Sequence, residues 1–220
     1  MIPGPDKIIA CLNCKGLAQY MTLVSGNTFG ARTWTDGKQI APMLPRPPVV
    51  VKCHHCGEFY WLAEAEEIGT TNPREGEGGE VNPAWADAQE VVEPTEEEYY
   101  QAIEKGFATN SGQERSLRVL AWWRRNDAFR DTAQAQFLED ANASGGCREN
   151  LEALRKLLTG EEDNDRLMKV EVLRELGDFE SAMQVLSRVT SPNLDGIVQQ
   201  FRSLCEDRDT CVRELHFSQK

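Results

Sequence analysis

The chain has 220 residues, of which 24 are basic and 36 acidic, and 40% of its residues are hydrophobic. This length suits one large domain or two small ones, and the motifs described below favour two. The longest aliphatic run, residues 49–51, is too short to cross a bilayer, and the first residues lack the apolar core of a signal peptide. We therefore expect a cytoplasmic protein that does not enter the membrane.

The acidic charge is concentrated in the middle of the sequence. Residues 1–62 carry six basic and three acidic side chains, whereas residues 63–99 carry twelve acidic side chains and one arginine. The remaining 121 residues hold 17 basic and 21 acidic side chains. Because like charges in one block act locally, within about 10 Å at ordinary salt, this distribution is more informative than the net charge of the chain.

Four cysteines form two Cys-x-x-Cys pairs, Cys11 with Cys14 and Cys53 with Cys56, which are separated by 38 residues. Two intervening residues allow a tight turn to direct both sulfurs at one metal ion, and two such turns complete a tetrahedral zinc shell. We therefore predict one structural zinc ion held by these four cysteines. A redox dithiol is the alternative, but it requires a βαβ context, whereas both pairs lie among predicted hairpins.

Together the two pairs resemble the knuckles of a zinc ribbon. Gly16 and Gly57 follow the pairs closely, where the turn reverses and a positive φ suits glycine. His54 and His55, inside the second turn, are expected to face solvent. Five strands are predicted, over residues 17–23, 29–35, 38–41, 49–52 and 58–62. The second and third flank Asp36-Gly37, a favoured hairpin turn, and the last two flank the second knuckle.

A longer stretch also resembles uncharacterised bacterial zinc-ribbon proteins, a resemblance that implies no activity. It comprises Ser25-Gly26-Asn27-Thr28-Phe29-Gly30, then Trp34, Asp36-Gly37-Lys38 and Ala41-Pro42-Met43-Leu44-Pro45.

Residues 68–94 are predicted to form an acidic flexible linker. This stretch is rich in glycine, proline and glutamate, with Trp85 as its only aromatic side chain. Such a composition buries too little apolar surface to offset the entropy of ordering.

The remainder of the chain has the periodicity of helices. Thr95 to Glu98 forms a capping box that starts a helix ending near Gly106, and a second helix is predicted over residues 114–125. Trp122 and Trp123 in that helix are expected either to pack in a core or to form a binding surface. Four further stripes of apolar residues, over 151–158, 167–176, 179–186 and 194–204, predict antiparallel helices joined by short turns.

The sequence Leu176-Gly177-Asp178-Phe179-Glu180-Ser181-Ala182 resembles the turn and second helix of a tetratricopeptide repeat. The match covers one repeat at most. The resemblance implies a repeat-like helical domain whose surface binds another protein.

These features predict an α+β protein. Its expected parts are a small β zinc ribbon over residues 1–67, the linker over 68–94, and an antiparallel, tetratricopeptide-like helical domain over 95–220. We expect the helical part to fold without zinc and to hold the partner-binding face.

The predicted function is a zinc-binding adaptor, in which zinc is structural and the helical domain binds an unidentified protein. One alternative is a nucleic-acid-binding ribbon, in which the aromatic side chains Tyr20, Phe29, Trp34, Tyr60 and Trp61 would stack on bases. The small positive charge of the ribbon makes nucleic acid a weak partner. A second alternative is an enzyme of unrecognised type, but no familiar catalytic motif occurs in the sequence and no catalytic residue is predicted.

Overall fold

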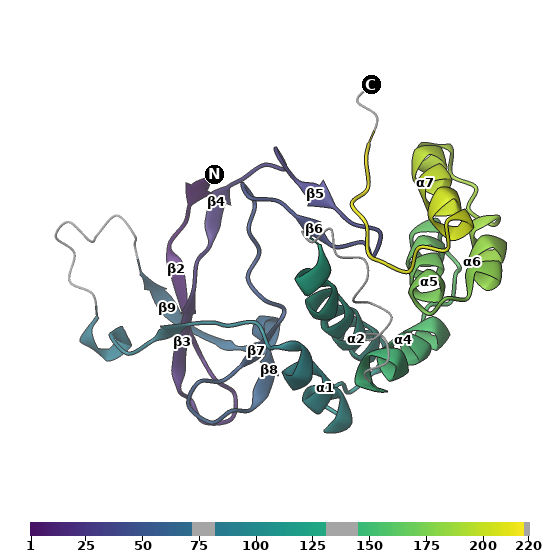
Figure 1. Cartoon of the computed structure of the whole chain (residues 1–220). Coiled ribbons are helices and arrows are strands. Elements are labelled where there is room, and N and C mark those ends of the chain that lie inside the picture. The colour runs from purple at the N-terminus through teal and green to yellow at the C-terminus, as the bar shows by residue number, and fades with distance from the viewer. Residues whose placement is uncertain (72–81, 131–144, 218–220) are drawn as a thin grey trace. The chain divides into compact units, whose positions relative to one another are not determined.

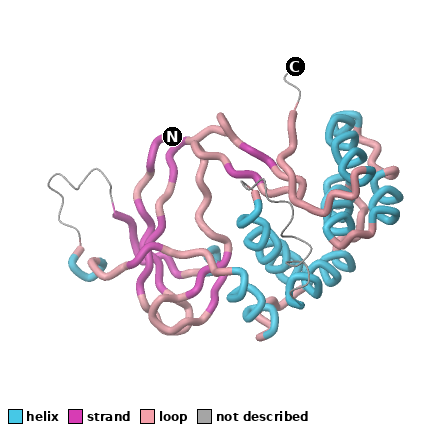
Figure 2. Tube along the Cα trace, in the orientation of Figure 1, coloured by secondary structure: helices cyan, strands magenta, loops and turns pink. Residues whose placement is uncertain are grey.

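The computed structural model describes residues 1–71, 82–130 and 145–217, and it divides the chain into two compact units. The β unit consists of Met1–Ala31 and Ile40–Pro94, and the helical unit consists of Arg32–Gln39 and Thr95–Lys220. Short strands followed by helices confirm the predicted α+β class (Figures 1 and 2).

The secondary structure of the described residues is as follows. The strands are β1 (Ile2–Pro3), β2 (Asp6–Ala10), β3 (Leu17–Tyr20), β4 (Leu23–Ser25), β5 (Arg32–Thr33), β6 (Gln39–Ile40), β7 (Val50–Lys52), β8 (Phe59–Trp61), β9 (Glu66–Thr71) and β10 (Gln89–Glu90). The α-helices are α1 (Glu96–Glu104), α2 (Ser111–Asn126), α4 (Gly145–Leu157), α5 (Asp163–Glu175), α6 (Phe179–Leu186) and α7 (Asp195–Glu206). Single 3-10 turns are η1 (Leu62–Glu64), η3 (Pro83–Trp85), η4 (Asp127–Phe129) and η6 (Pro192–Leu194).

The largest sheet of the β unit has the strand order β10-β3-β2-β9, with β2 antiparallel to both β3 and β9 (Figure 1). Strand β2, which the sequence analysis did not predict, is central, and its residues Ile8, Ile9 and Ala10 are buried. Its apolar residues are consecutive because both faces are covered, so the strand lacks the alternation by which half-buried strands are recognised.

Both ends of the predicted acidic linker belong to this sheet. Strand β9 pairs with β2, and β10 pairs in parallel with β3. The indole ring of Trp85 lies where a side chain at Gly69 would be, 2.6 Å from an ideal Cβ, so it packs directly on β9. Strand pairing and this one aromatic contact order residues whose composition alone predicted flexibility. The glycine- and glutamate-rich centre of the predicted linker, residues 72–81, lies outside the described residues.

The helical unit begins as the sequence predicts. Thr95 accepts a hydrogen bond from the Glu98 amide and the Glu98 side chain accepts one from the Thr95 amide, which completes the capping box of α1. Gly106 follows the helix with a φ of 67°. None of the described helices is both long and apolar enough to span a bilayer.

Helices α5 and α6 pack against each other across a tight turn at Gly177, whose φ is 80°. Asp178 caps α6 by accepting a hydrogen bond from the Ser181 amide, and Ala182 is fully buried in the core shared with α7. These are the local features on which the tetratricopeptide resemblance depends. Membership of that repeat class remains a prediction.

The hairpin Arg32–Gln39, formed around β5 and the start of β6, is part of the helical unit although the sequence analysis placed it in the ribbon. Its Thr35 amide donates to the Arg213 carbonyl (2.8 Å), and the Leu215 amide donates to the Thr33 carbonyl (2.8 Å). Trp34, at the centre of the hairpin, is 1% exposed. The helical unit therefore combines residues about 180 positions apart in the chain.

Candidate metal centre

Four cysteine sulfurs converge in the β unit. Cys11 directly follows β2 and Cys53 directly follows β7, so each Cys-x-x-Cys pair begins where a strand ends. The four Sγ atoms all lie within 4.8 Å of one another. Cys11 and Cys53 are buried, Cys56 is half-buried and Cys14 is exposed. The two pairs are thus brought close enough together to coordinate one metal ion.

The sulfur spacing matches a tetrahedral site. The Sγ atoms of Cys11 and Cys56 are 3.9 Å apart, and those of Cys14 and Cys53 are 3.6 Å apart. In a tetrahedral zinc site with Zn–S bonds of about 2.3 Å, neighbouring sulfurs are about 3.8 Å apart. The cage fits a single ion bonded to all four thiolates.

The two knuckles have the same backbone hydrogen bonds. In the first, the Cys11 amide donates to the Gly16 carbonyl and the Lys15 amide donates to the Cys11 carbonyl (2.9 and 3.0 Å). In the second, the equivalent bonds join Cys53 to Glu58 and Gly57 to Cys53, at 2.9 Å each. The position equivalent to Gly57 is therefore Lys15, one residue earlier than the predicted Gly16.

Backbone angles agree with this equivalence. Gly57 has a φ of 75°, as predicted, whereas in the first knuckle Lys15 has a φ of 60° and Gly16 is not in the left-handed region. The expectation for Gly16 was therefore wrong. Because a side chain crowds the backbone in that region, the first knuckle is strained at Lys15.

Gly16 is required for a different reason, which is the close approach of His55. A Cβ atom at Gly16 would lie 2.3 Å from Cδ2 of the His55 ring. Nε2 of His55 lies 3.3 Å from the Leu17 carbonyl, and Nε2 of His54 lies 2.9 Å from the Glu90 carbonyl. Both histidines are exposed, as expected, but each ring also links the second knuckle to a strand of the main sheet.

Hydrogen-bond donors contact the sulfurs of Cys14, Cys53 and Cys56. The Gly16 amide donates to Cys14 Sγ and the His55 amide donates to Cys53 Sγ, both at 3.4 Å. The Glu58 amide and the Asn13 side chain donate to Cys56 and lower the pKa of its thiol to about 6. Donors of this kind stabilise thiolates, the form in which cysteine binds a metal. At Cys53 burial has the larger effect and raises the pKa of the thiol to about 12.

The donor set favours some metals over others. Four thiolates at tetrahedral spacing suit zinc or iron and disfavour magnesium or calcium, which prefer oxygen ligands. A zinc ion here would be held by Cys11, Cys14, Cys53 and Cys56 and would crosslink the two knuckles. With four protein ligands such an ion would have no open position for a substrate, so its role would be structural.

The site is part of the core of the β unit. Cys11 and Cys53 belong to one buried cluster with five other residues, namely Ile9, Ala18, Val51, Tyr60 and Val91. On the surface, Lys7 and Lys15 form ion pairs with Glu67 and Glu66 of β9, at 2.8 and 3.0 Å. The acidic residues after the second knuckle therefore neutralise lysines near the first.

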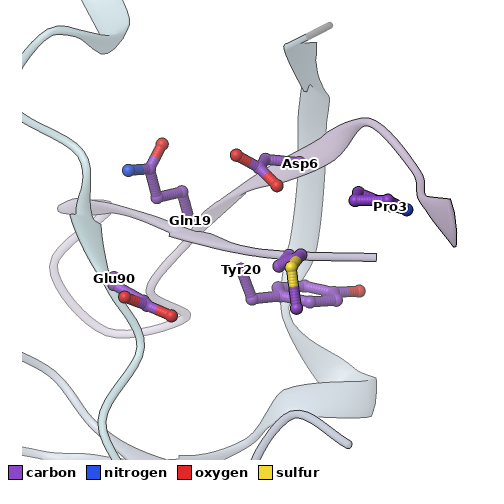
Figure 3. A pocket seen from close by; sticks show the side chains of 6 residues that line it. Pro3, Asp6, Gln19, Tyr20 and Glu90 are labelled. Carbon is purple, nitrogen blue, oxygen red and sulfur yellow. The ribbon is translucent and has the colours of Figure 1, made fainter. Parts of the chain in front are cut away.

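A shallow pocket of about 240 Å³ lies elsewhere on the β unit (Figure 3). Its walls are Pro3, Asp6, Gln19, Tyr20, Met21 and Glu90. Ligand pockets usually exceed about 300 Å³. Within the described residues, the four cysteines are the only close group of three or more side chains that could bind a metal. The described residues that line the pocket therefore do not form a second such group.

The helical unit contains a buried polar cluster that the sequence analysis missed. Asp36 of the hairpin is fully buried and accepts hydrogen bonds from Arg130 Nη2 (2.6 Å), Arg130 Nη1 (3.1 Å) and Asn126 Nδ2 (3.1 Å). Thr35 beside it donates to Glu171, which forms a buried ion pair with Arg174. Helix periodicity gives no signal for such a cluster, because its partners lie far apart in the sequence.

The two tryptophans of α2 are bound into this cluster. Trp122 is 1% exposed and its Nε1 donates to Glu175 (2.8 Å), while Nε1 of Trp123 donates to the Asp36 carbonyl (2.9 Å). Trp122 is a core residue, and Trp123 is partly buried and packs against the same core. Cys147, for which the sequence offered no role, is buried in the same apolar cluster as Trp122.

Comparisons with models of protein families, with curated proteins and with solved structures found no match to this chain. The metal centre is therefore interpreted from its own geometry.

Proposed function

We propose that this protein is a zinc-binding adaptor. One zinc ion, held by Cys11, Cys14, Cys53 and Cys56, stabilises the β unit, and the helical unit binds a protein partner. The observation that carries the proposal is the cage of four sulfurs at tetrahedral spacing, which provides a complete shell for one structural ion.

A structural role fits the size of the β unit. Its strands are only two to six residues long, and small modules of this kind bury too little apolar surface to be stable unaided. Structural zinc contributes roughly 10 kcal/mol or more in comparable modules. Because two of the cysteines are core residues of this unit, metal binding and packing reinforce each other.

The adaptor role is supported by the arrangement of the last helices. Helices α5, α6 and α7 pack in sequence order, with one shared core that contains Leu173, Ala182 and Phe201. Stacked helical pairs leave long exposed helix faces, which repeat-like proteins use to bind other proteins.

Two observations disfavour the nucleic-acid alternative. Among the aromatic residues proposed to stack on bases, Trp34, Tyr60 and Trp61 are at most 9% exposed. Two lysines of the β unit, Lys7 and Lys15, are paired with glutamates, which weakens attraction to phosphate.

Metal analysis of the purified chain tests the first half of the proposal. We expect one zinc per chain, lost in Cys53→Ser and retained in Cys205→Ala, which removes a buried cysteine outside the cage. Zinc retained by Cys53→Ser at full stoichiometry would contradict the assignment.

The second half is tested by crosslinking the full chain to a co-purifying protein and locating the crosslinks. Deletion of residues 1–67 is unsuitable because it removes the hairpin Arg32–Gln39 from the helical unit. The double variant Cys11→Ser/Cys53→Ser keeps that hairpin. Partner binding should survive in this variant, with crosslinks on residues 95–217; binding that disappears together with the metal would contradict the helical assignment.

A further inference from the structure

Between the first β hairpins and the second knuckle runs an exposed proline-rich segment. Residues 44–49 have the sequence Leu-Pro-Arg-Pro-Pro-Val and contain no helix or strand. Pro45, Arg46 and Pro47 are exposed, Val49 is 51% exposed, and Leu44 and Pro48 are partly exposed. We call these six residues the proline strip.

Local sterics give the proline strip one preferred conformation. Each proline ring fixes φ near −65°, and a residue that precedes proline is restricted to extended ψ angles. Leu44, Arg46 and Pro47 all precede a proline. The segment is therefore biased towards a polyproline II helix, which has three residues per turn and no internal backbone hydrogen bonds. Pro45 and Pro48 then lie on one edge, and Arg46 and Val49 lie on the next.

Both ends of the proline strip are fixed to the β unit. At the start, the Asn27 amide donates to the Met43 carbonyl (3.2 Å), and the Leu44 side chain packs closely over Gly26. At the other end, the Leu62 amide donates to the Val49 carbonyl (2.9 Å), and Val50 and Val51 of β7 are fully buried. A partner would therefore meet a segment that is already ordered, which lowers the entropic cost of binding.

Arg46 gives the proline strip a positive charge that no described residue neutralises. Its side chain is exposed, and it has no hydrogen bond or ion pair with any residue that the structure describes. This is notable in a chain with 36 acidic residues. A guanidinium that is unpaired within the described chain can form a bidentate ion pair with a carboxylate of another protein.

We propose that the proline strip is a docking site for a protein domain that reads polyproline II helices. Such domains bind the prolines in a groove lined by aromatic side chains. The partner groove would accept the Pro45 and Pro48 edge and would place a carboxylate opposite Arg46. This inference goes beyond the proposed function, because it assigns a partner class to the β unit, independently of the helical face.

The test uses the full-length zinc-loaded chain and a panel of isolated domains of the SH3, WW and EVH1 types. At least one domain should bind the wild-type chain, and Pro45→Ala/Pro48→Ala should weaken that binding at least tenfold. Arg46→Glu should do the same. Pro192→Ala, the same change at an exposed proline of the helical unit, should alter the affinity by less than twofold.

A second measurement does not depend on any variant. Amide resonances of Leu44, Arg46 and Val49 should shift when the binding domain is added to the isotope-labelled wild-type chain. The proposal is wrong if no domain of the panel binds, if the proline variants bind like wild type while retaining zinc, or if only resonances outside residues 44–49 shift. None of these outcomes affects the zinc assignment or the helical face, so failure here is distinguishable from failure of the proposed function.

Discussion

Asp36 and Arg130, 94 positions apart in the sequence, form a two-point ion pair in which both side chains are almost completely buried. The carboxylate belongs to the hairpin Arg32–Gln39, and the guanidinium follows η4, the 3-10 turn after α2. Arg130 also lies over the ring of Trp34, 5.0 Å from its centroid. This pair is a buried polar link between the hairpin and the residues that follow α2.

We predict that Asp36→Ala destabilises the helical unit by about 3–5 kcal/mol, because removal of one partner leaves a buried charge uncompensated. The matched change Asp127→Ala removes a carboxylate that also contacts Arg130 but is 24% exposed, and it should cost much less. Urea unfolding, monitored by the circular dichroism of the helices, measures the free energy of unfolding of both variants. An equal loss of unfolding free energy in the two variants would show that the buried Asp36–Arg130 pair stabilises the unit no more than the partly exposed contact does.

The fragment 95–220 should be much less stable than the helical unit within the whole chain. Without the hairpin, Asn126, Arg130 and Trp123 lose their Asp36 partner, and Arg213 and Leu215 lose their β partners. This changes the expectation that residues 95–220 fold unaided. Adding a synthetic peptide of residues 31–40 should raise the melting temperature of the fragment. A peptide that carries Asp36→Ala should have little effect, and a fragment that melts like the full chain without any peptide would contradict the prediction.

Lys15→Gly should stabilise the zinc-loaded β unit by about 1 kcal/mol relative to Lys15→Ala, because glycine adopts the positive φ of this position without strain. The comparison with alanine separates backbone strain from loss of the exposed Lys15–Glu66 ion pair, which both variants lack. Urea unfolding monitored by tryptophan fluorescence provides the measurement. Equal stability of the two variants would mean that Lys15 is not strained.

Gly16→Ala should destabilise the metal centre by about 1–3 kcal/mol, because the new methyl group overlaps the His55 ring and overpacked contacts cost this much. The ring must move and lose its contact with the Leu17 carbonyl. In a His55→Ala background the same substitution should cost far less, so a double-mutant cycle isolates the clash. Competition with a zinc chelator gives the readout. Equal costs in both backgrounds would assign the requirement for Gly16 to something other than His55.

Glu175 should make stability depend on pH. Burial raises the pKa of this carboxyl well above its ordinary value, and the nearby carboxylates of Glu171 and Asp36 raise it further. The folded chain then keeps a proton that the unfolded chain releases near pH 4.5, so stability falls as the pH rises from there through the folded pKa.

Glu175→Gln removes this titration and should therefore give a shallower decrease in unfolding free energy as the pH rises above 4.5. Both proteins should be compared in excess zinc, so that metal loss does not contribute. The slope of unfolding free energy against pH is compared between the two proteins. The absolute unfolding free energies are not compared, because glutamine also alters the hydrogen bonds to Trp122 and Asn126. Parallel curves would show that Glu175 does not titrate in this range.

Local sequence features determined the secondary structure that follows Pro94 and the four candidate metal ligands. The capping box at Thr95 and the glycine turn at Gly177 act through neighbouring residues, so they were readable without any tertiary contact. The two Cys-x-x-Cys pairs were readable because metal chemistry restricts ligand type and spacing. The equivalence of Lys15 and Gly57 could not be predicted from the sequence, because it depends on backbone hydrogen bonds within each knuckle.

Only the tertiary structure decided how distant segments combine. Glu66 and Glu67 belong to the acidic block of residues 63–99, but as residues of β9 they form ion pairs with Lys15 and Lys7. The Asp36-Gly37 turn was predicted correctly as a turn, yet its membership of the helical unit depends on Arg130 and on the C-terminal segment near Arg213. A buried charge is stable only where a distant partner compensates it, and no local pattern encodes which partner that will be.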